Sequence, residues 1–560
     1  MAPRPSESLL PGHLADSTPG AALAGWMVLA ALALVLLALL PEEDMPTAGT
    51  ALLTIGAIGL WRWGWAALHF VRALIYRRRV FPRLRALADG APLPPALYVV
   101  VTSYRISPEM NAAVYGRLLD EVMRLRIPCC VVACITDMAD AEVLRLVFDR
   151  RRATLAEGSA LYLLPQAGTG KRGALVDAIN LIQGLGPAPQ AQMLLMDGDT
   201  LVEPGQLEKT CRFLSAFPDV GAVTTDNLPL VRGPAPVREW YRLRMAQRDQ
   251  AMCSMALSRR LLVLTGRFSL FRMAAVASPG FALAIGNDGI RHWRLGFIRM
   301  VTGDDKSTWF ALLKTPWRML YIPDVAVICA EELPAGGWFK ATTALMLRWY
   351  GNTTRNNGRA LALGPGRLGW FFWLCLLDQR VSPWTSLAGP SVMLVAAILH
   401  GYGFIILYVL WVLFTRSMIT LLNWWGTGRF HPIFPLLLYY NQIVGSVVKI
   451  FVLHHPDRQR WNRQGLAATG NQGLAARLSP GFFAVSLCSF LLLVLALAQR
   501  LDPQVEHGAP VGLPAVLDSR PRPEHYLRMP CAPDRLTPCT TVTPPPPPAS
   551  LIAPGPRPRA

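Results

Sequence analysis

The sequence lacks any pair of cysteines in a CxxC arrangement. Its ten cysteines are scattered over 560 residues, and the closest group is Cys129, Cys130 and Cys134 in an apolar, strand-like run. Structural zinc sites and disulfide frameworks need cysteines at short, recognisable spacings. We therefore expect neither kind of site, and we interpret the cysteines as reduced residues of a core.

The sequence also lacks the signatures of nucleic-acid-binding modules. The net charge is +19, with arginine supplying nearly all of the excess, so phosphate, carboxylate and anionic lipid are all plausible partners. However, we find no zinc-finger spacing, basic zipper or RNA-binding signature. The basic residues cluster beside apolar segments, as cytoplasmic flanks do. We therefore expect no nucleic-acid partner.

Apolar residues are more abundant than a soluble domain of this size needs. They make up 52% of the chain, and the mean hydropathy is positive. Residues 1–20 are rich in Pro, Ser and Gly, which predicts disorder. Residues 21–76 predict two transmembrane helices, one over the apolar residues 21–40 and one over about 50–75. A cleaved signal peptide is the alternative for the first, but its length and weakly basic start favour an uncleaved span.

A basic cluster follows the second apolar segment. Basic residues directly after a span mark its cytoplasmic side, so residues 77–345 are expected in the cytosol. The cluster consists of Arg77, Arg78, Arg79, Arg83 and Arg85.

Short apolar runs alternate with helical stretches from about residue 94 to 340. This pattern is typical of a doubly wound α/β domain. We expect strands over 97–101 and 129–135 and a helix over 110–125. Asp137, just after the second strand, could contact a nucleobase or ribose, or could cap the next helix.

The run MLLMDGDT, residues 193–200, predicts a buried strand that ends in two carboxylates. Four apolar residues lead into Asp197 and Asp199, and Gly198 between them permits close approach of a ligand to the backbone. Ligands of open α/β sheets bind at the carboxyl ends of the strands. Hard oxygen ligands suit Mg²⁺ or Mn²⁺, which bind one or two carboxylates plus substrate phosphates. An Asp-Gly turn is the alternative for an isolated DGD.

The segment GTGKR, residues 168–172, is expected to open a helix. Its backbone N–H groups, with Lys171 and Arg172, could face a diphosphate. It is not a Walker P-loop, because Pro165 replaces the first glycine and Arg172 replaces Ser or Thr. Further glycine and acidic motifs follow in TGRFSLFR (265–272) and TGDDKS (302–307), and LMLRWYGN (345–352) contains Arg348 and Trp349.

Apolar content returns after residue 365. We expect interfacial helices over 346–380 and transmembrane helices over 381–499, with spans at 385–399, 404–422 and 482–498. The segment 432–453 is ambiguous between a span and a re-entrant helix, because Asn441, Gln442 and Lys449 lie within it. The total is therefore five or six spans. Residues 500–560, with five consecutive prolines, predict a disordered tail.

Taken in chain order, the strand-end aspartate, GTGKR, DGD, TGR, TGDD and RW resemble the motifs of processive family 2 glycosyltransferases. This group contains cellulose, chitin and hyaluronan synthases. The stretches TSYRI, HWRLG, RWYGN, RLGWF, DQRVS and LYYNQIVG are similar to those of the catalytic subunits of bacterial alginate synthases, and the similarity covers roughly residues 55–465. One departure is Leu345, where synthases of the cellulose type carry glutamine.

The resemblance implies a glycosyltransferase A-type domain inserted between transmembrane helices, and it implies roles for the motif residues. Asp199 and Asp197 would hold Mg²⁺ or Mn²⁺ and the nucleotide, and Asp305 would be the general base, with Asp304 orienting it or binding donor. Trp349 would stack under the acceptor sugar, although a core aromatic is the alternative. The donor pocket would comprise Asp137, Lys171, Arg172, Asp197 and Arg348.

The implied reaction is inverting polymerisation of mannuronate from GDP-mannuronate into a β-1,4-linked polysaccharide, translocated across the bacterial inner membrane. No RxxxR followed by DxSxxG is present, so a separate membrane copolymerase would carry the cyclic-di-GMP sensor. Alternatives are a synthase that uses a UDP sugar, a single-sugar membrane transferase, and a non-enzymatic subunit, against which the retained acidic motifs argue. An anionic donor needs cations along its path, and those near the motifs are Arg267, Arg272, Arg294, Arg348 and Arg355.

Overall fold

A computed structural model describes residues 19–39, 45–167, 170–300, 303–331, 333–334, 336–461, 466–467 and 477–499. The predictions of disorder for residues 1–20 and 500–560 lie outside the described residues, except that helix α1 (Pro19–Ala38) begins at Pro19.

One half of the central sheet is parallel. Its eight strands have the order β3-β2-β1-β4-β7-β6-β10-β5, and β1, β2, β3 and β4 pair in parallel. These strands are almost continuous runs of Val, Leu, Ile, Cys and Met, as expected when helices cover both faces of a sheet. The predicted strands at 97–101 and 129–135 are confirmed. The bounds are β1 (Leu97–Thr102), β2 (Cys129–Ile135), β3 (Ala160–Pro165) and β4 (Gln192–Asp197).

The other half makes the sheet mixed. Strand β7 (Phe268–Arg272) lies antiparallel between β4 and β6 (Val220–Val231), whereas β10 (Arg318–Glu331) runs parallel to β6. The short β5 (Thr200–Leu201) closes the edge antiparallel to β10. The β6–β10 pairing shifts register between Ile322 and Ala326, and such an irregularity bends a strand. The result is a curled mixed sheet of the glycosyltransferase A type.

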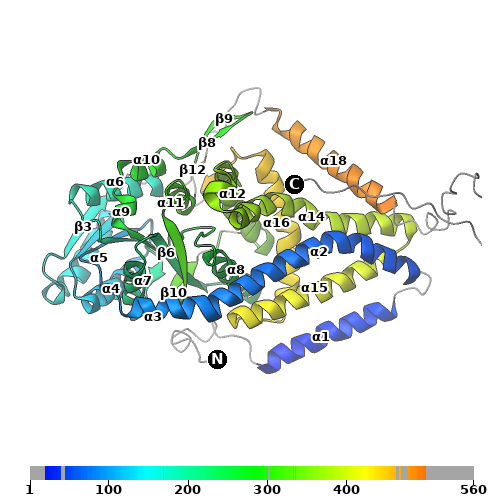
Figure 1. Ribbon diagram of the computed structural model, residues 1–560, viewed down its shortest axis with the longest axis horizontal. Helices are drawn as coiled ribbons and strands as arrows, with labels where there is room; N and C mark the ends of the chain where they lie inside the picture. The colour runs from blue at the N-terminus through cyan, green and yellow to red at the C-terminus, as the bar shows by residue number, and fades with distance from the viewer. Residues whose placement is uncertain are drawn as a thin grey trace, which may run out of the picture. The chain divides into compact units, whose positions relative to one another are not determined.

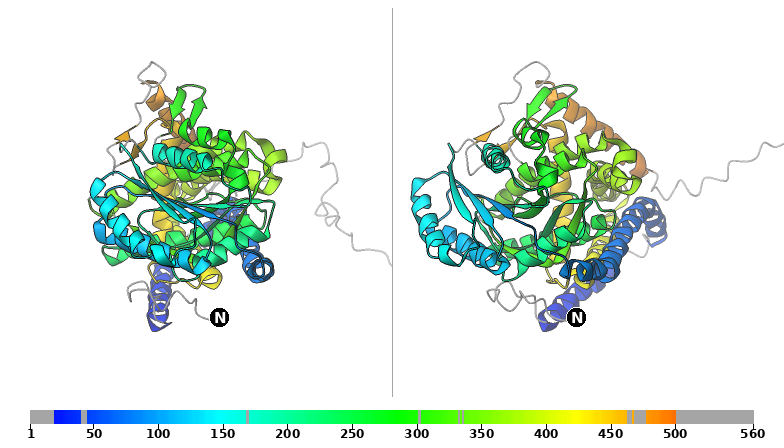
Figure 2. Two further views of the ribbon diagram at one scale, coloured as in Figure 1. Left: turned by 90° about the vertical axis from the view of Figure 1, so that its left-hand side faces the viewer. Right: turned by 60° about the vertical axis from the view of Figure 1, so that its left-hand side comes forward.

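Helices lie on both faces of this sheet (Figure 2). Helix α4 has Ser107 as its cap, whose hydroxyl accepts a hydrogen bond from the N–H of Met110. The helices of this part are α3 (Phe81–Asp89), α4 (Pro108–Leu125), α5 (Met138–Asp149), α6 (Lys171–Gly184), α7 (Gln206–Ala216), α8 (Ala235–Ala256), α9 (Met273–Val276), α10 (Pro279–Gly286) and α11 (Asp304–Leu313). Short elements are the 3₁₀-helix η5 (Arg152–Thr154) and the strands β8 (Gly289–His292), β9 (Gly296–Arg299), β11 (Arg460–Trp461) and β12 (Leu466–Ala467).

Long apolar helices make up most of the remainder. Within the described residues, four stretches are long and apolar enough to cross a bilayer: Trp370–Leu399, Gly403–Thr427, Phe434–His454 and Ser479–Ala496. A shorter apolar stretch, Leu23–Ala38, lies in α1. The bounds are α2 (Met45–Ile75), α12 (Trp338–Leu361), α13 (Gly364–Leu368), α14 (Trp370–His400), α15 (Gly403–Thr427), α16 (Phe434–His454) and α18 (Ser479–Gln499).

Helix α14 differs from the expected arrangement, and α16 bears on a segment that the sequence left ambiguous. Helix α14 joins the segment expected to lie at the interface with the following span, and it continues through Pro383 and Pro390. Prolines are tolerated in apolar helices whose neighbours satisfy the freed backbone groups. The ambiguous segment 432–453 forms one unbroken helix, α16, despite its polar residues.

Buried polar contacts fix the sheet domain to the long helices. A π-helix, η4 (Tyr76–Val80), follows α2, and the Tyr76 hydroxyl donates to the backbone oxygen of Tyr321 in β10 at 2.6 Å. Arg77 pairs with Asp249 of α8 at 2.5 Å. Helices α2, α8 and α15 lie side by side (Figure 1). Part of the basic cluster predicted as a membrane flank therefore anchors α2 to α8.

Candidate active site

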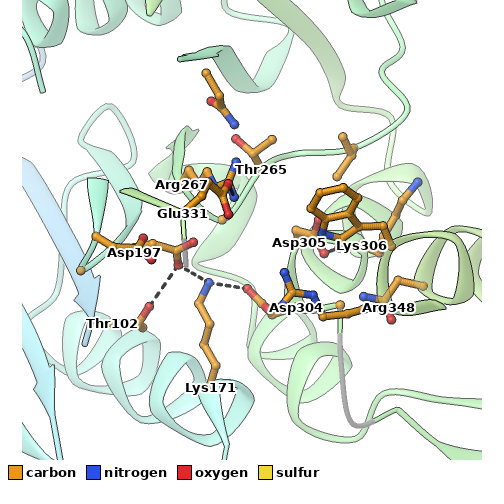
Figure 3. Close-up of a pocket in the computed structure, with 18 of the residues that line it drawn as sticks. Thr102, Lys171, Asp197, Thr265, Arg267, Asp304, Asp305, Lys306, Glu331 and Arg348 are labelled. Atoms are coloured by element: carbon orange, nitrogen blue, oxygen red, sulfur yellow. Dashed lines mark hydrogen bonds and ion pairs between the residues drawn. The ribbon is translucent and has the colours of Figure 1, made fainter. Parts of the chain in front are cut away.

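A cavity of about 490 Å³ opens at the carboxyl ends of β1 and β4 (Figure 3). Its lining includes Thr102 from β1, the DGD turn, the start of α6, the TGR turn, the start of α11 and the RW pair of α12. Motifs far apart in the chain therefore meet at the edge where α/β sheets bind their ligands.

Lys171 connects two of the acidic motifs. Its Nζ lies 2.5 Å from Asp197 Oδ1 and 2.7 Å from Asp304 Oδ2 (Figure 3). Burial opposes the charged form, but the two carboxylates outweigh it and raise the pKa of Lys171 above its ordinary value. Lys171 is the first residue of α6, so the helix start brings its charge to the strand end.

Two glycines make this approach possible. A Cβ at Gly198 would collide with Ser103, which sits directly after β1. A Cβ at Gly266, in the TGR turn, would lie 2.6 Å from Lys171 Nζ and 3.2 Å from Asp304 Oδ2. Position 198 therefore favours glycine because the Ser103 backbone comes close, whereas a side chain at position 266 would displace the Lys171 amine.

Asp304 and Asp305 begin α11 in different environments. Burial raises the pKa of Asp304, but Lys171 and then Arg172 outweigh it and bring the pKa below the ordinary value. Burial, together with the charge of Asp304, raises the pKa of Asp305. Adjacent carboxylates whose pKa values are pushed apart suit different roles. Asp304 is the paired anion and Asp305 is the better proton acceptor.

The DGD carboxylates fit a divalent metal only together with ligand oxygens. Among the described residues, no group of three or more His, Cys, Asp or Glu could hold a metal ion. Asp197 is paired with Lys171, while Asp199 also lines the cavity, and its backbone oxygen accepts from the N–H of Ala330 at 3.0 Å. Mg²⁺ and Mn²⁺ commonly take one or two carboxylates and complete their shell with phosphate oxygens and water. Asp199, with Asp197, could supply that minimal set.

Arg348 and Trp349 of α12 line the same cavity. The Trp349 ring is half-buried and stacks on Trp240 of α8, with centroids 5.6 Å apart and planes at 9°. Leu345, one turn earlier, is buried beside Trp240 in a separate hydrophobic cluster. Trp349 therefore packs as a core aromatic while also bordering the cavity.

Two predicted donor-pocket residues do not line the cavity. Asp137 is exposed and caps α5, its Oδ1 accepting from the N–H of Ala139 at 3.0 Å, while the preceding Thr136 borders the cavity. Arg172 turns away and pairs with Asp288 at 3.1 Å. The prediction that two cations of GTGKR face one ligand therefore needs correction, because only Lys171 points into the cavity. Gly168 and Thr169 lie outside the described residues.

Asp288 is the centre of a buried network behind α11. It accepts from Arg172 of α6, from Ser307 of α11 and, through an ion pair, from Arg359 of α12. Burial raises the pKa of Asp288, but Arg359 and Arg172 outweigh it and lower the pKa below the ordinary value. The helices that carry Lys171, the acidic pair and the RW pair are thus held by one carboxylate.

The structure corrects the expected cation path. Arg267 and Arg348 line the cavity, but Arg272 donates to backbone oxygens at the C-terminal end of α7. Arg294 donates to Ser479 and to the backbone of His454, and Arg355 donates to Asn352. These side chains serve internal contacts, which proximity in the sequence could not reveal.

Several cavity residues were missed from sequence. Glu331 ends β10 and forms a partly buried ion pair with Arg267, and Arg244 and Arg248 of α8 also line the cavity. Glu331 follows a long apolar strand run, so the rule of strand-end acids could have found it. No motif marks the two arginines.

Comparison with known proteins agrees with these motifs. The family described as "Glycosyltransferase like family 2" matches residues 94–352. The protein named Glycosyltransferase alg8 from Pseudomonas syringae pv. tomato is 39% identical over 445 residues, which cover 79% of this chain and 90% of that protein. The protein of the same name from Azotobacter vinelandii is also 39% identical, over 446 residues, with the same coverage.

Among solved structures, the chain is similar to the mannosyltransferase PcManGT from Pyrobaculum calidifontis in complex with GDP-Man and Mn²⁺. The match has 18% identity and a TM-score of 0.43, and it covers 71% of this chain and 99% of that one. By its identity to the curated relatives over most of both lengths, the chain belongs to the Alg8 family of glycosyltransferases and contains a family 2 glycosyltransferase domain.

Proposed function

We propose that this glycosyltransferase polymerises mannuronate from GDP-mannuronate into a β-1,4-linked polysaccharide and moves the product across the bacterial inner membrane. The observation that carries the proposal is that DGD and TGDD meet at Lys171 and share one cavity with RW, in a chain whose described residues include four helices able to span a bilayer. Membership of the Alg8 family supports alginate synthesis as the setting.

In the proposed reaction, an acceptor hydroxyl attacks the anomeric carbon of the donor as the nucleoside diphosphate leaves from the opposite side, so the configuration inverts. Asp305 accepts the hydroxyl proton, and its raised pKa suits a base. Asp304 stays ionised in its pair with Lys171 and fixes the start of α11 beside the acceptor. A general base must lie close to the proton that it removes, and Asp305 lines the cavity in which the acceptor would bind.

The leaving diphosphate is stabilised by cations. Mg²⁺ or Mn²⁺, held by Asp199 and Asp197, would neutralise the charge that develops on the phosphate oxygens. Lys171 and Arg348 border the same space and can donate to those oxygens. Trp349 offers the flat apolar face against which the terminal sugar of the acceptor packs.

Control is proposed to come from a separate membrane copolymerase that carries a cyclic-di-GMP sensor. The support is the lack of RxxxR followed by DxSxxG after the catalytic region. The rate of polymer synthesis by the purified chain should rise on adding the partner with cyclic-di-GMP. Full synthesis by the single chain, unaffected by either addition, would contradict this arrangement.

Product length separates polymerisation from single-sugar transfer. Membranes containing the chain and its partner would receive labelled GDP-mannuronate, and the product would be sized before and after digestion with a β-1,4-mannuronan lyase. We expect long, lyase-sensitive product. Label confined to a lipid or to an acceptor extended by one sugar would favour a single-sugar membrane transferase.

A further inference from the structure

A second cavity, of about 720 Å³, adjoins the catalytic one. It lies among α2, α8, α12, α14, α15 and α16, and Arg244 of α8 lines both cavities. The lining of the second cavity includes Arg62, Arg416 and Lys449 but, among the residues that the structure describes, no acidic side chain. A positively charged space within apolar helices therefore borders the site of chemistry.

Two arginines of α8 lead from one cavity to the other. Arg248 lines the catalytic cavity, and Arg244 lies one helical turn before it on the same helix face. Neither forms an ion pair with any described carboxylate. Arg248 donates once, to the backbone oxygen of Thr225 at 3.1 Å, while its Nε and Nη1 are buried without a hydrogen-bond partner. Like charges four residues apart on a helix repel each other, so the two arginines lower the stability of the fold unless an anion lies between them.

Two further cations stand among the spans. Lys449 of α16 lies with its Nζ 4.7 Å from the centre of the Tyr350 ring, and Arg244 faces the same ring at 5.0 Å. Arg416 belongs to α15, and its Nε is buried and unbonded. Within the described part of the chain, neither Lys449 nor Arg416 has a carboxylate partner.

Arg62 provides the contrast. It belongs to α2, and its Nη1 lies 2.8 Å from Asp378, so its charge is balanced within the protein. Ionisable residues within membrane helices are expensive and usually pair with one another or with a ligand. Among the described residues, no carboxylate forms an ion pair with Arg244, Arg416 or Lys449, which indicates an anionic ligand.

The remaining lining suits a carbohydrate. Trp63, Trp65 and Trp411 offer flat rings against which the C–H faces of sugars can pack. Asn441 and Gln442 of α16 offer an amide nitrogen and an amide oxygen, both buried and without a partner, to sugar hydroxyls. Rings, amides and unbalanced cations together match a sugar chain that carries carboxylates.

We propose that Arg248, Arg244, Lys449 and Arg416 form a cation relay that binds the carboxylates of an anionic polysaccharide as it leaves the catalytic cavity, and that the relay discriminates against neutral chains. The inference rests on the proposed function, since the polymer is the product of the neighbouring site. An anionic phospholipid is another source of negative charge, but Arg244 connects the relay to the catalytic cavity, which favours the product.

Binding of defined oligosaccharides tests the relay without any donor. The full chain, in nanodiscs of neutral lipid, would be titrated with a fluorescent oligomannuronate and with an oligomannose of equal length. We expect binding of the oligomannuronate only, weakening as salt is raised. Lys449→Met and Arg416→Met should each weaken it roughly 10-fold, the scale of one charge-assisted hydrogen bond. Lys449→Arg and Arg416→Lys should bind within about 3-fold of the wild type on the same scale.

Lys340→Met is the matched control, because Lys340 is exposed and lies outside both cavities. Since the relay charges are unbalanced, their removal should not lower the thermal unfolding temperature, so lost binding cannot be ascribed to unfolding. Three results would overturn the proposal. The first is equal binding of the neutral oligosaccharide, and the second is unchanged binding by both methionine variants. The third is displacement of the ligand by phosphatidylglycerol but not by unlabelled mannuronate oligomers. Failure of GDP-mannuronate as a donor would refute the proposed function but leave this binding result interpretable.

Discussion

Asp304 and Asp305 are neighbours in sequence, yet they have opposite environments. Lys171 neutralises Asp304, whereas Asp305 is half-buried next to that charge, and its carboxylate accepts a hydrogen bond from the N–H of Lys306 at 2.8 Å. The first is therefore suited to hold structure and the second to accept a proton. The division of roles follows from the two environments.

Replacing Asp305 with asparagine should abolish polymer synthesis while leaving donor binding nearly intact. The amide cannot accept the proton, and a general base contributes about 10² to 10⁴ in rate. The measurement is polymer formation in membranes with equal protein levels, beside donor affinity from nucleotide titration. Near-wild-type synthesis by Asp305→Asn would reject Asp305 as the base.

The pH dependence of turnover should reflect the raised pKa of Asp305. The base works only when ionised, so turnover should rise with pH through a pKa above that of an ordinary aspartate, about 3.9. Ionisation of this buried group also costs stability as pH rises through its folded-state pKa. Thermal unfolding of Asp305→Asn at neutral pH should therefore occur no lower than for the wild type. A rate profile flat down to the ordinary aspartate range would contradict this assignment.

At the residue scale, sequence reasoning identified segments that line the cavity better than it predicted the direction of each side chain. Asp197, Asp199, Asp304, Asp305 and Lys171 could be predicted because they stand where strands end or helices begin. Arg172 could not, since successive helix residues point about 100° apart at 3.6 residues per turn. Only the packed structure shows that Lys171 faces the cavity and that its neighbour faces Asp288.

At the scale of elements, Asp288 holds together the helices that carry the motifs. Its carboxylate pairs with Arg172 of α6 and Arg359 of α12 and accepts from Ser307 of α11. Any displacement of α11 would move Asp305 relative to the acceptor. We therefore expect Asp288, which is not among the residues that line the cavity, to act as a positioning residue.

The variant Asp288→Asn should destabilise the domain by roughly 3–5 kcal/mol, because it leaves buried arginines without their anion. The pKa of Asp288 is lowered in the fold, so this stabilisation is present above the unfolded-state pKa and is lost as pH falls through the folded one. The difference in unfolding temperature between wild type and variant should narrow in acid. Polymer synthesis by the folded variant should be slower than that of the wild type, and the KM for the acceptor should change less than the rate.

The control is Asp219→Asn, since Asp219 pairs with Arg259 at the surface with both side chains more than a third exposed. An exposed pair contributes about 0–1 kcal/mol. Equal effects of the two substitutions on stability and rate would show that the Asp288 network has no special role.

The sequence predicted whether a segment forms a helix or a strand better than it predicted the direction of a strand or the continuity of a helix. The apolar runs predicted the parallel strands, but β7 inserts antiparallel between β4 and β6, and an apolar run does not encode its direction. The polar residues of α16 left the sequence ambiguous between a span and a re-entrant helix, and in the structure several of them line a cavity beside one unbroken helix. Continuity depended on packing between helices that are distant in sequence.

At the scale of the whole molecule, the catalytic domain and the apolar helices share cavity walls. Helices α8 and α12 contribute to both the catalytic cavity and the cavity among the spans. If the chain exports its product as proposed, a polymer formed beside Asp305 would meet these helices directly.

Exhaustive chelation of divalent metal should abolish turnover, and adding Mg²⁺ or Mn²⁺ should restore it. Asp197 and Asp199 could hold the ion only with the diphosphate of the donor, so chelation should also weaken nucleotide binding. Thermal unfolding without donor should barely change. Full activity in a chelator, with metal content verified by elemental analysis, would contradict a metal-assisted transfer.

The choice of donor sugar tests most directly the claim that this chain polymerises mannuronate from GDP-mannuronate. Membranes containing this chain and its partners would receive labelled GDP-mannuronate, UDP-glucose, UDP-glucuronate or UDP-N-acetylglucosamine in parallel, and label in polymer would be counted. An anionic product matches the unbalanced cations of the second cavity, so we predict incorporation from GDP-mannuronate alone. Incorporation only from a UDP sugar would contradict the alginate assignment while leaving the chain a family 2 glycosyltransferase.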